Sequence, residues 1–191
     1  MPRPPATSHD DLVAVARELL ASGGVDALST RALARGAGVS AGTPYRYFAD
    51  KDALLLAVAT TVESEFVAAL DLAAPFDTPL PPALAAIART LVDRAHRTPE
   101  LAHLLALPPH LSPALRGDGV TAWINRRVTI SQQAGEVAGG DPGLVAQAAF
   151  GLVRGVLAGA GNADPAAQEC VITDGIAGLL GLAPGQGPEP T

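Results

Sequence analysis

The stretch Ser29–Phe48, which reads STRALARGAGVSAGTPYRYF, decides the fold. Ser29 or Thr30 can cap a short helix that ends near Gly36–Gly38, and Ser40 can cap a second one. Both helices would be shorter than the roughly 12–15 residues below which an isolated helix is marginal in water, so each must pack against something. Two short helices joined by a tight turn predict a helix-turn-helix, whose second helix can enter a major groove of DNA.

Longer helices are expected on both sides of this stretch and would supply the packing surface. Apolar residues recur at helical spacing before it and end at Ser22-Gly23-Gly24, where glycine suits a helix C-terminus. After it, Asp50 can cap a long helix with a continuous apolar face. The first stripe comprises Leu12, Val15, Ala16, Leu19 and Leu20, and the second comprises Leu55, Val58, Ala59, Val62, Phe66 and Leu70.

The remaining chain also indicates helices, because strand signals of period two are nearly absent. Prolines at 75, 79, 81 and 82 predict a linker over 74–82. Further helices are expected at 82–97, 99–107, 112–137 (with an interruption at Gly117–Gly119), 143–161 and 165–182. The fold class is therefore all-α with about nine helices. We expect a disordered arm over 1–9, a DNA-binding domain over 10–54, a second helical domain over 55–182 and a disordered tail over 183–191.

The composition of the chain argues against a disulfide-stabilised protein and against a membrane-spanning one. The chain has 191 residues, 13 Lys and Arg against 19 Asp and Glu, a net charge of −6 and one cysteine. Residues 1–52 carry equal numbers of positive and negative side chains, so all of the net negative charge lies beyond them. A single cysteine excludes a disulfide framework. The longest apolar stretch, 144–161, contains Arg154, which opposes a membrane span. We expect a cytoplasmic protein without a membrane partner.

The segment 38–54, GVSAGTPYRYFADKDAL, together with Leu28-Ser29-Thr30-Arg31, resembles the signature of the TetR (tetracycline-repressor) family of bacterial transcription regulators. The resemblance covers residues 10–58, about a quarter of the chain. It implies a homodimer that binds double-stranded DNA at a pseudo-palindromic operator and is a repressor released by a small-molecule effector. Because no Ser/His/Asp, Cys/His or paired-carboxylate set can be assembled from recognisable motifs, we expect no enzymatic activity, no cofactor and no metal.

The resemblance also implies which residues meet DNA: Thr30, Arg31, Ala41, Gly42, Thr43, Tyr45, Arg46, Tyr47 and Lys51. An arginine can hold guanine O6 and N7 with two hydrogen bonds, which makes Arg46 the best candidate for reading bases in the second helix, with Arg31 in the first. The tyrosine hydroxyls and Lys51 would meet phosphates. Pro44 departs from the family pattern of a branched apolar residue, and its ring is expected to fill the same slot.

Two further sets of residues follow from the implied effector and dimer. The effector pocket would be lined by Phe66, Leu91, His103, Leu104, Trp123, Arg127 and Phe150, since such cavities have apolar walls and few polar groups. The dimer interface would lie in 143–182 and include Gly151, Gly155, Gly159, Ile176, Leu179 and Leu180. The alternative is that these glycines pack within one chain or reflect genome composition.

Several other patterns have weaker interpretations. Gly38–Gly42 spells the G-x-S-x-G of hydrolases, and Gly36–Ala41 mimics a dinucleotide fingerprint, but both motifs require a preceding strand. His96, His103 and His110 recur every seven residues, yet prolines between them oppose a metal site on one helix. Cys170 is expected to be a core or interface residue. The rival function is a helical ligand-binding or enzymatic protein that retains a non-functional helix-turn-helix.

Overall fold

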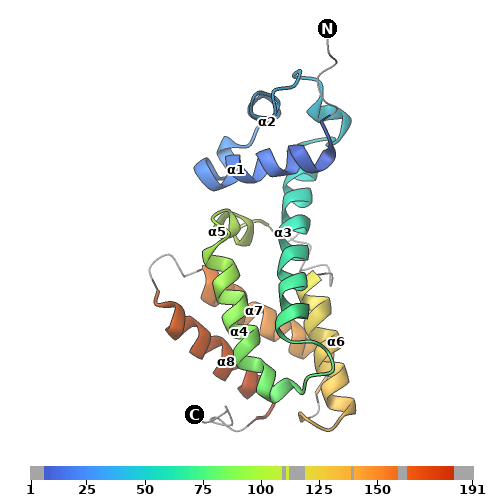
Figure 1. The fold of residues 1–191 in the computed structure, drawn as a ribbon, viewed down its shortest axis with the longest axis vertical. Helices are drawn as coiled ribbons and strands as arrows, with labels where there is room; N and C mark the ends of the chain where they lie inside the picture. The colour runs from blue at the N-terminus through green and yellow to red at the C-terminus, as the bar shows by residue number, and fades with distance from the viewer. Residues whose placement is uncertain (1–6, 109–110, 112–118, 139, 159–162, 183–191) are drawn as a thin grey trace. The chain divides into compact units, whose positions relative to one another are not determined.

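The computed structural model describes residues 7–108, 111, 119–138, 140–158 and 163–182. These residues form eight α-helices and one 3₁₀ helix and contain no strand, which confirms the predicted all-α class (Figure 1). In chain order the elements are α1 (His9–Ala27), α2 (Thr30–Gly36), the 3₁₀ helix η1 (Pro44–Arg46), α3 (Lys51–Ala73), α4 (Leu80–His96), α5 (Leu101–Leu105), α6 (Gly119–Gln133), α7 (Pro142–Ala158) and α8 (Pro165–Leu179).

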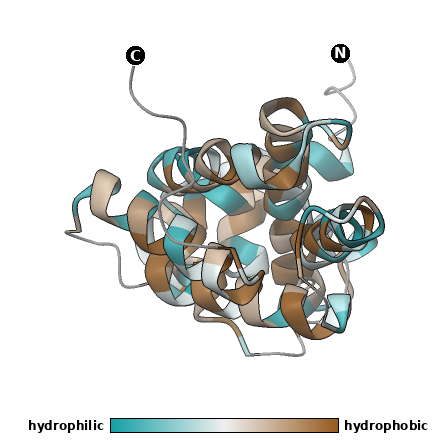
Figure 2. Ribbon diagram, turned by 90° about the horizontal axis from the view of Figure 1, so that it is seen from below, coloured by the Kyte–Doolittle hydropathy of each residue, from teal (hydrophilic) through white to brown (hydrophobic). Residues whose placement is uncertain are grey.

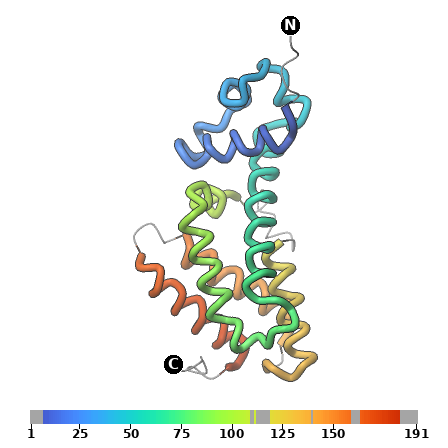
Figure 3. Tube along the Cα trace, viewed as in Figure 1, coloured from blue at the N-terminus to red at the C-terminus, as the bar shows by residue number. Residues whose placement is uncertain are grey.

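The chain divides into two compact units. The first comprises residues 1–62 together with 99–112, and the second comprises 63–98 together with 113–191. This division differs from the predicted boundary after residue 54 in two ways. Helix α3 continues through that boundary without interruption (Figure 3). In addition, α5 packs against α1 and therefore belongs to the first unit, although it is distant in sequence.

In the first unit, α1 begins with a reciprocal capping box between Ser8 and Asp11. The Ser8 hydroxyl accepts from the Asp11 backbone N–H, and the Asp11 carboxylate accepts from the Ser8 N–H. These hydrogen bonds lower the pKa of Asp11. Gly24 has φ +65° and interrupts the helix where the glycine pair predicted its end, and one more turn follows to Ala27. Leu12, Ala16 and Leu20 are fully buried along the predicted stripe.

Helix α3 has the predicted cap and the predicted apolar face. Asp50 Oδ1 accepts from the backbone N–H of Ala53 at 2.7 Å. All six residues of the expected stripe, from Leu55 to Leu70, are buried. Among the described residues, α3 is the one helix long and apolar enough to cross a membrane. A core helix of a globular protein has the same properties, and the buried stripe accounts for the apolar composition here.

The second unit is built from residues 63–73 of α3 together with α4, α6, α7 and α8. Helix α7 packs against α6 and α8, and α4 packs against α8. Hydrophobic and hydrophilic segments alternate along the helices in Figure 2, as expected for helices that bury one side. The linker ends at Pro79, three residues before the predicted end at Pro82, because Pro81 and Pro82 fit in the first turn of α4, where their missing N–H groups have no intrahelical partner.

Candidate nucleic-acid interface

The predicted helix-turn-helix is present, but its second helix is much shorter than expected. Ser29 caps α2 through a hydrogen bond to the Ala32 N–H at 3.1 Å, and Gly38 turns the chain with φ +65°. Beyond the turn only Pro44–Arg46 is helical, and it is 3₁₀. The prediction of an α-helix capped by Ser40 is therefore wrong, because the Ser40 hydroxyl instead contacts the Thr43 hydroxyl at 2.9 Å.

Pro44 explains this difference. It has no N–H to donate to the Ser40 carbonyl, so that oxygen accepts from Thr43 N–H, three residues away, at 2.9 Å. Arg46 and Tyr47 likewise donate to carbonyls three residues earlier, which is the 3₁₀ pattern. The Pro44 side chain is fully buried and fills the apolar slot, as predicted. Val39, which follows the Gly38 turn, is half-buried.

The residues predicted to meet DNA lie at the surface of the first unit. Six of them are exposed and the other three are half-buried. Tyr45 is 61% exposed, although large hydrophobic and aromatic side chains are usually buried in globular proteins. The exposed residues are Arg31, Ala41, Gly42, Tyr45, Arg46 and Tyr47, and the half-buried ones are Thr30, Thr43 and Lys51.

Hydroxyl groups tie this surface together. The Thr30 and Tyr45 hydroxyls are 3.0 Å apart and join the first turn of α2 to η1. Tyr47 Oη donates to the Thr7 carbonyl at 2.6 Å and joins η1 to the segment before α1. The His9 and Phe48 rings, with centroids 5.0 Å apart, pack beside that link. Each bond connects segments that are far apart in the sequence.

The cations of this surface are unpaired within the described part of the chain. Arg31, Arg46 and Lys51 make no hydrogen bond or ion pair there. Arg35 was not predicted as a site residue, yet it is exposed and follows Arg31 by one helical turn on α2. The spacing of four between two arginines is the sequence signal that could have found it.

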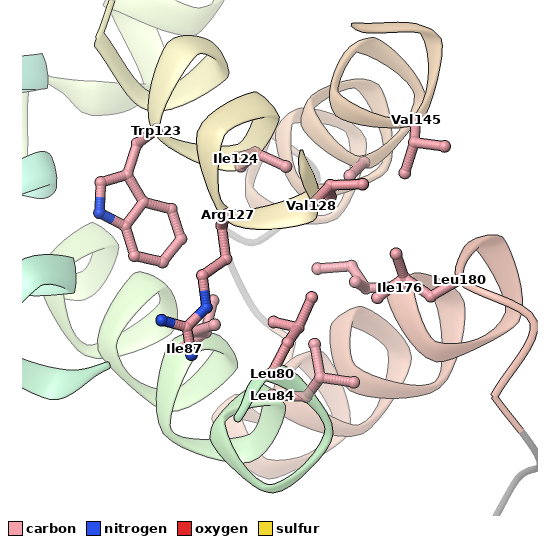
Figure 4. Close-up of a pocket in the computed structure, with 11 residues that line it drawn as sticks. Leu80, Leu84, Ile87, Trp123, Ile124, Arg127, Val128, Val145, Ile176 and Leu180 are labelled. Atoms are coloured by element: carbon pink, nitrogen blue, oxygen red, sulfur yellow. The ribbon is translucent and has the colours of Figure 1, made fainter. Parts of the chain in front are cut away.

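A second candidate site lies in the second unit. A cavity of about 30 Å³ is enclosed by α4, α6, α7 and α8 (Figure 4). It includes Trp123 and Arg127 from the predicted effector pocket, and also Ile176 and Leu180, which were assigned to the dimer interface. The other lining residues are Leu80, Leu84, Ile87, Ile124, Val128, Val145 and Ala149, all apolar.

Arg127 is the polar group of this cavity and is only 2% exposed. Its side chain extends from α6 towards α4 (Figure 4). Nη1 donates to the Pro75 carbonyl at 2.6 Å, and Nη2 donates to the Thr78 carbonyl. Its Nε is buried without a hydrogen-bond partner in the described structure. Burial lowers the pKa of Arg127, and the charges of Glu136 and Asp77 oppose that shift.

The rest of the predicted pocket is not gathered around this cavity. His103 and Leu104 belong to α5 in the first unit, where His103 lies against Gly24. Phe66 and Leu91 are buried and Phe150 is half-buried, but none of them lines the cavity.

The predicted dimer residues divide between two environments. Gly151 and Gly155 are exposed, and a Cβ at either position would meet no described atom within 4 Å, so no close contact among the described residues explains them. Leu179 is 41% exposed. Ile176 and Leu180 instead face the interior of the unit. Gly159 lies outside the described residues.

The weaker sequence patterns form no site in the described residues. Ser40 of the G-x-S-x-G pattern follows α2 rather than a strand. His96 contacts Gln168 in the second unit at 2.9 Å, while His103 lies in the first and His110 is outside the described residues. No group of three or more potential metal ligands occurs there. Cys170 is exposed rather than in the core.

Comparison with known proteins identifies the first unit. A sequence model of the tetR family of bacterial regulatory proteins matches residues 12–58. No curated protein sequence matches the chain significantly.

Solved structures share the fold of nearly the whole chain. RolR in complex with resorcinol has 21% sequence identity and a TM-score of 0.76, with 95% of each chain covered. FadR from Bacillus subtilis in complex with stearoyl-CoA has 19% identity and a TM-score of 0.74, covering 88% of this chain and 97% of FadR. A protein from Rhodococcus sp. described as a TetR-family transcriptional regulator has 18% identity and a TM-score of 0.73, covering 90% of this chain and 97% of that one.

The matched residues span α2, the Gly38 turn and η1, which are the elements that carry the exposed arginines and tyrosines. The helices that follow have the architecture of the same regulators over about nine-tenths of the chain. Residues 12–58 therefore carry the N-terminal sequence pattern of the tetR family of bacterial regulatory proteins, and the chain as a whole has the fold of a solved TetR-family transcriptional regulator.

Proposed function

We propose that the chain is a sequence-specific DNA-binding repressor that acts in the cytoplasm as a homodimer and leaves its operator when a small-molecule effector binds. The observation that carries the DNA-binding part is the exposure of Arg31 and Arg46 without partners in the described structure. Arg31 directly follows Thr30 in the sequence, and Arg46 directly follows Tyr45; the hydroxyls of Thr30 and Tyr45 are hydrogen-bonded to each other. Unpaired cations on a helix-turn-helix can contact phosphates and base edges.

The test is to select duplexes from a random pool and measure their binding by fluorescence anisotropy. We expect an enriched pseudo-palindrome, and Arg46→Ala should weaken binding to it and reduce selectivity. Arg97→Ala is a matched control, because Arg97 is an exposed arginine at the end of α4 in the second unit. A chain that enriches no sequence would support the rival interpretation, a ligand-binding or enzymatic protein with a non-functional helix-turn-helix.

The effector is proposed to bind at the cavity around Trp123 and Arg127, whose walls must move apart to admit it, because about 30 Å³ holds only a water-sized group. Apolar walls with one buried guanidinium suit a mainly apolar ligand, and RolR and FadR have resorcinol and stearoyl-CoA bound in their structures. Resorcinol and stearoyl-CoA are therefore the first probes in an operator-release assay. For a ligand that causes release, Val145→Phe, which fills the cavity, should prevent it. Ala85→Phe, on the exposed side of α4 and away from the cavity, should not.

The homodimer is proposed to form through the outer faces of α7 and α8. Leu144 and Val171 are 67% and 52% exposed there, and the open surface at Gly151 and Gly155 permits close approach of a second copy. Sedimentation analysis should give a dimer that Val171→Asp weakens. Ala85→Asp places the same charge on the exposed side of α4 and should leave the dimer intact. Equal effects of the two substitutions would contradict this interface.

A further inference from the structure

The hydroxyl groups of the proposed DNA-binding surface have little capacity left for DNA. A tyrosine hydroxyl carries one proton, and Tyr47 donates its proton to the Thr7 carbonyl at 2.6 Å. It therefore has no donor for a phosphate, which only accepts. One of the Thr30 and Tyr45 hydroxyls uses its proton on the other, and the same holds for Ser40 and Thr43. Each pair retains a single free donor.

The two arginines of this surface, unlike the hydroxyl groups, retain their hydrogen-bond donors. Arg31 and Arg46 are exposed, and all five N–H donors of each guanidinium are free of bonds to the described residues. Ala41 and Gly42, exposed between them in the sequence, offer no polar side-chain atom. The two arginines therefore hold most of the free side-chain donors that the predicted DNA-binding residues can offer to base edges.

The Thr30–Tyr45 bond also determines how these arginines stand relative to each other. Thr30 directly precedes Arg31, and Tyr45 directly precedes Arg46. The 3.0 Å hydrogen bond therefore joins the two residues that immediately precede the arginines. The 3₁₀ turn at Pro44–Arg46 is too short to be rigid alone, because it contains one turn without a side-chain cap. The hydroxyl bond across to α2 supplies the missing constraint.

We infer that each half-site is read through two guanines, one by Arg31 and one by Arg46, and that Tyr45 is a positioning residue that holds the two arginines in register through Thr30. This inference rests on the proposed DNA-binding function. Arginine is the side chain that pairs with guanine O6 and N7 in two hydrogen bonds, which supports discrimination of about 5- to 150-fold. The hydroxyls and Lys51 contribute affinity without base selection.

The test uses the full-length protein and the duplex enriched by selection. Each guanine in one half-site is replaced singly by 7-deazaguanine, which removes the N7 acceptor and keeps Watson–Crick pairing and the phosphates. We expect two positions at which Kd rises about 5- to 150-fold. Arg31→Ala should abolish the penalty at one position and Arg46→Ala at the other, as a double-mutant cycle requires for direct partners. Lys51→Ala should weaken all duplexes alike and leave both penalties unchanged.

The positioning role is tested by Tyr45→Phe, which keeps the ring and removes only the hydroxyl. We expect both 7-deazaguanine penalties to shrink several-fold, while the slope of log Kd against log salt stays the same. Tyr47→Phe is the matched control and should preserve both penalties, because that hydroxyl bonds to Thr7 instead.

Two outcomes overturn the inference while the proposed function stands: an enriched duplex whose guanines all tolerate the replacement, or penalties that persist in both arginine variants. Penalties that Tyr45→Phe leaves unchanged overturn the positioning role. If no duplex is enriched, the proposed function itself fails, so the two failures are distinguishable.

Discussion

Replacement of Arg127 by methionine should destabilise the second unit strongly. The guanidinium donates to the Pro75 and Thr78 carbonyls, and a longer contact of 3.4 Å reaches the Ala74 carbonyl. A hydrogen bond from a charged donor contributes about 1.5–3 kcal/mol, so the two short bonds are together worth roughly 3–6 kcal/mol. Methionine avoids the cost of burying a charge, which the lowered pKa of Arg127 reflects. We therefore expect a net loss of about 2–4 kcal/mol.

The assay is urea unfolding followed by the fluorescence of Trp123, the single tryptophan, which lies one helical turn before Arg127 on α6. Arg126→Met is the matched control. Arg126 is exposed, and its guanidinium carbon lies 4.5 Å from the centre of the Phe76 ring, a contact worth about 0.5–1 kcal/mol. The reasoning is refuted if Arg127→Met is no less stable than Arg126→Met.

Three further changes test other contacts. Arg17→Met should cost about 3 kcal/mol in urea unfolding, because it leaves the Glu100 carboxylate, 4% exposed, without its partner; Glu100→Gln should cost less, and the reverse order would contradict a buried pair. Pro44→Ala should restore an N–H that can donate to the Ser40 carbonyl, so Cα chemical shifts at 45–47 should become α-helical, and unchanged shifts would mean that proline is not the cause. The hydrogen bond and the charge of Asp174 raise the pKa of the Cys170 thiol, which lowers its thiolate fraction at neutral pH. Asp174→Asn should therefore speed alkylation by iodoacetamide several-fold, and an unchanged rate would reject this cause.

The sequence predicted the elements whose causes are local. Ser29 and Asp50 were identified as caps, and both accept the expected backbone N–H, since a cap and its partner are three residues apart. The apolar stripe from Leu55 to Leu70 was identified from its spacing and is buried along its whole length. The nine residues proposed to meet DNA were found because they lie in one short motif, and none of them is buried.

The second site could be predicted only in part. Trp123 and Arg127, both predicted as pocket residues because effector cavities have apolar walls and few polar groups, line the cavity. Leu80, Ile87 and Val145 were missed, because nothing in their sequence distinguishes a cavity wall from the rest of a core. His103 was placed at the pocket by its position in the chain, yet α5 packs in the first unit.

The residues by themselves determined that the chain is helical, where the helix-turn-helix lies and which of its side chains carry charge. Periodicity and capping act over three or four residues, so they can be seen in the sequence. The tertiary structure alone decided which partners those side chains have. Arg17 meets Glu100 across 83 residues of chain, and Tyr45 bonds to Thr30 across 15. Such bonds depend on how helices pack, and many packings satisfy the same local pattern, so the sequence could not specify them by inspection.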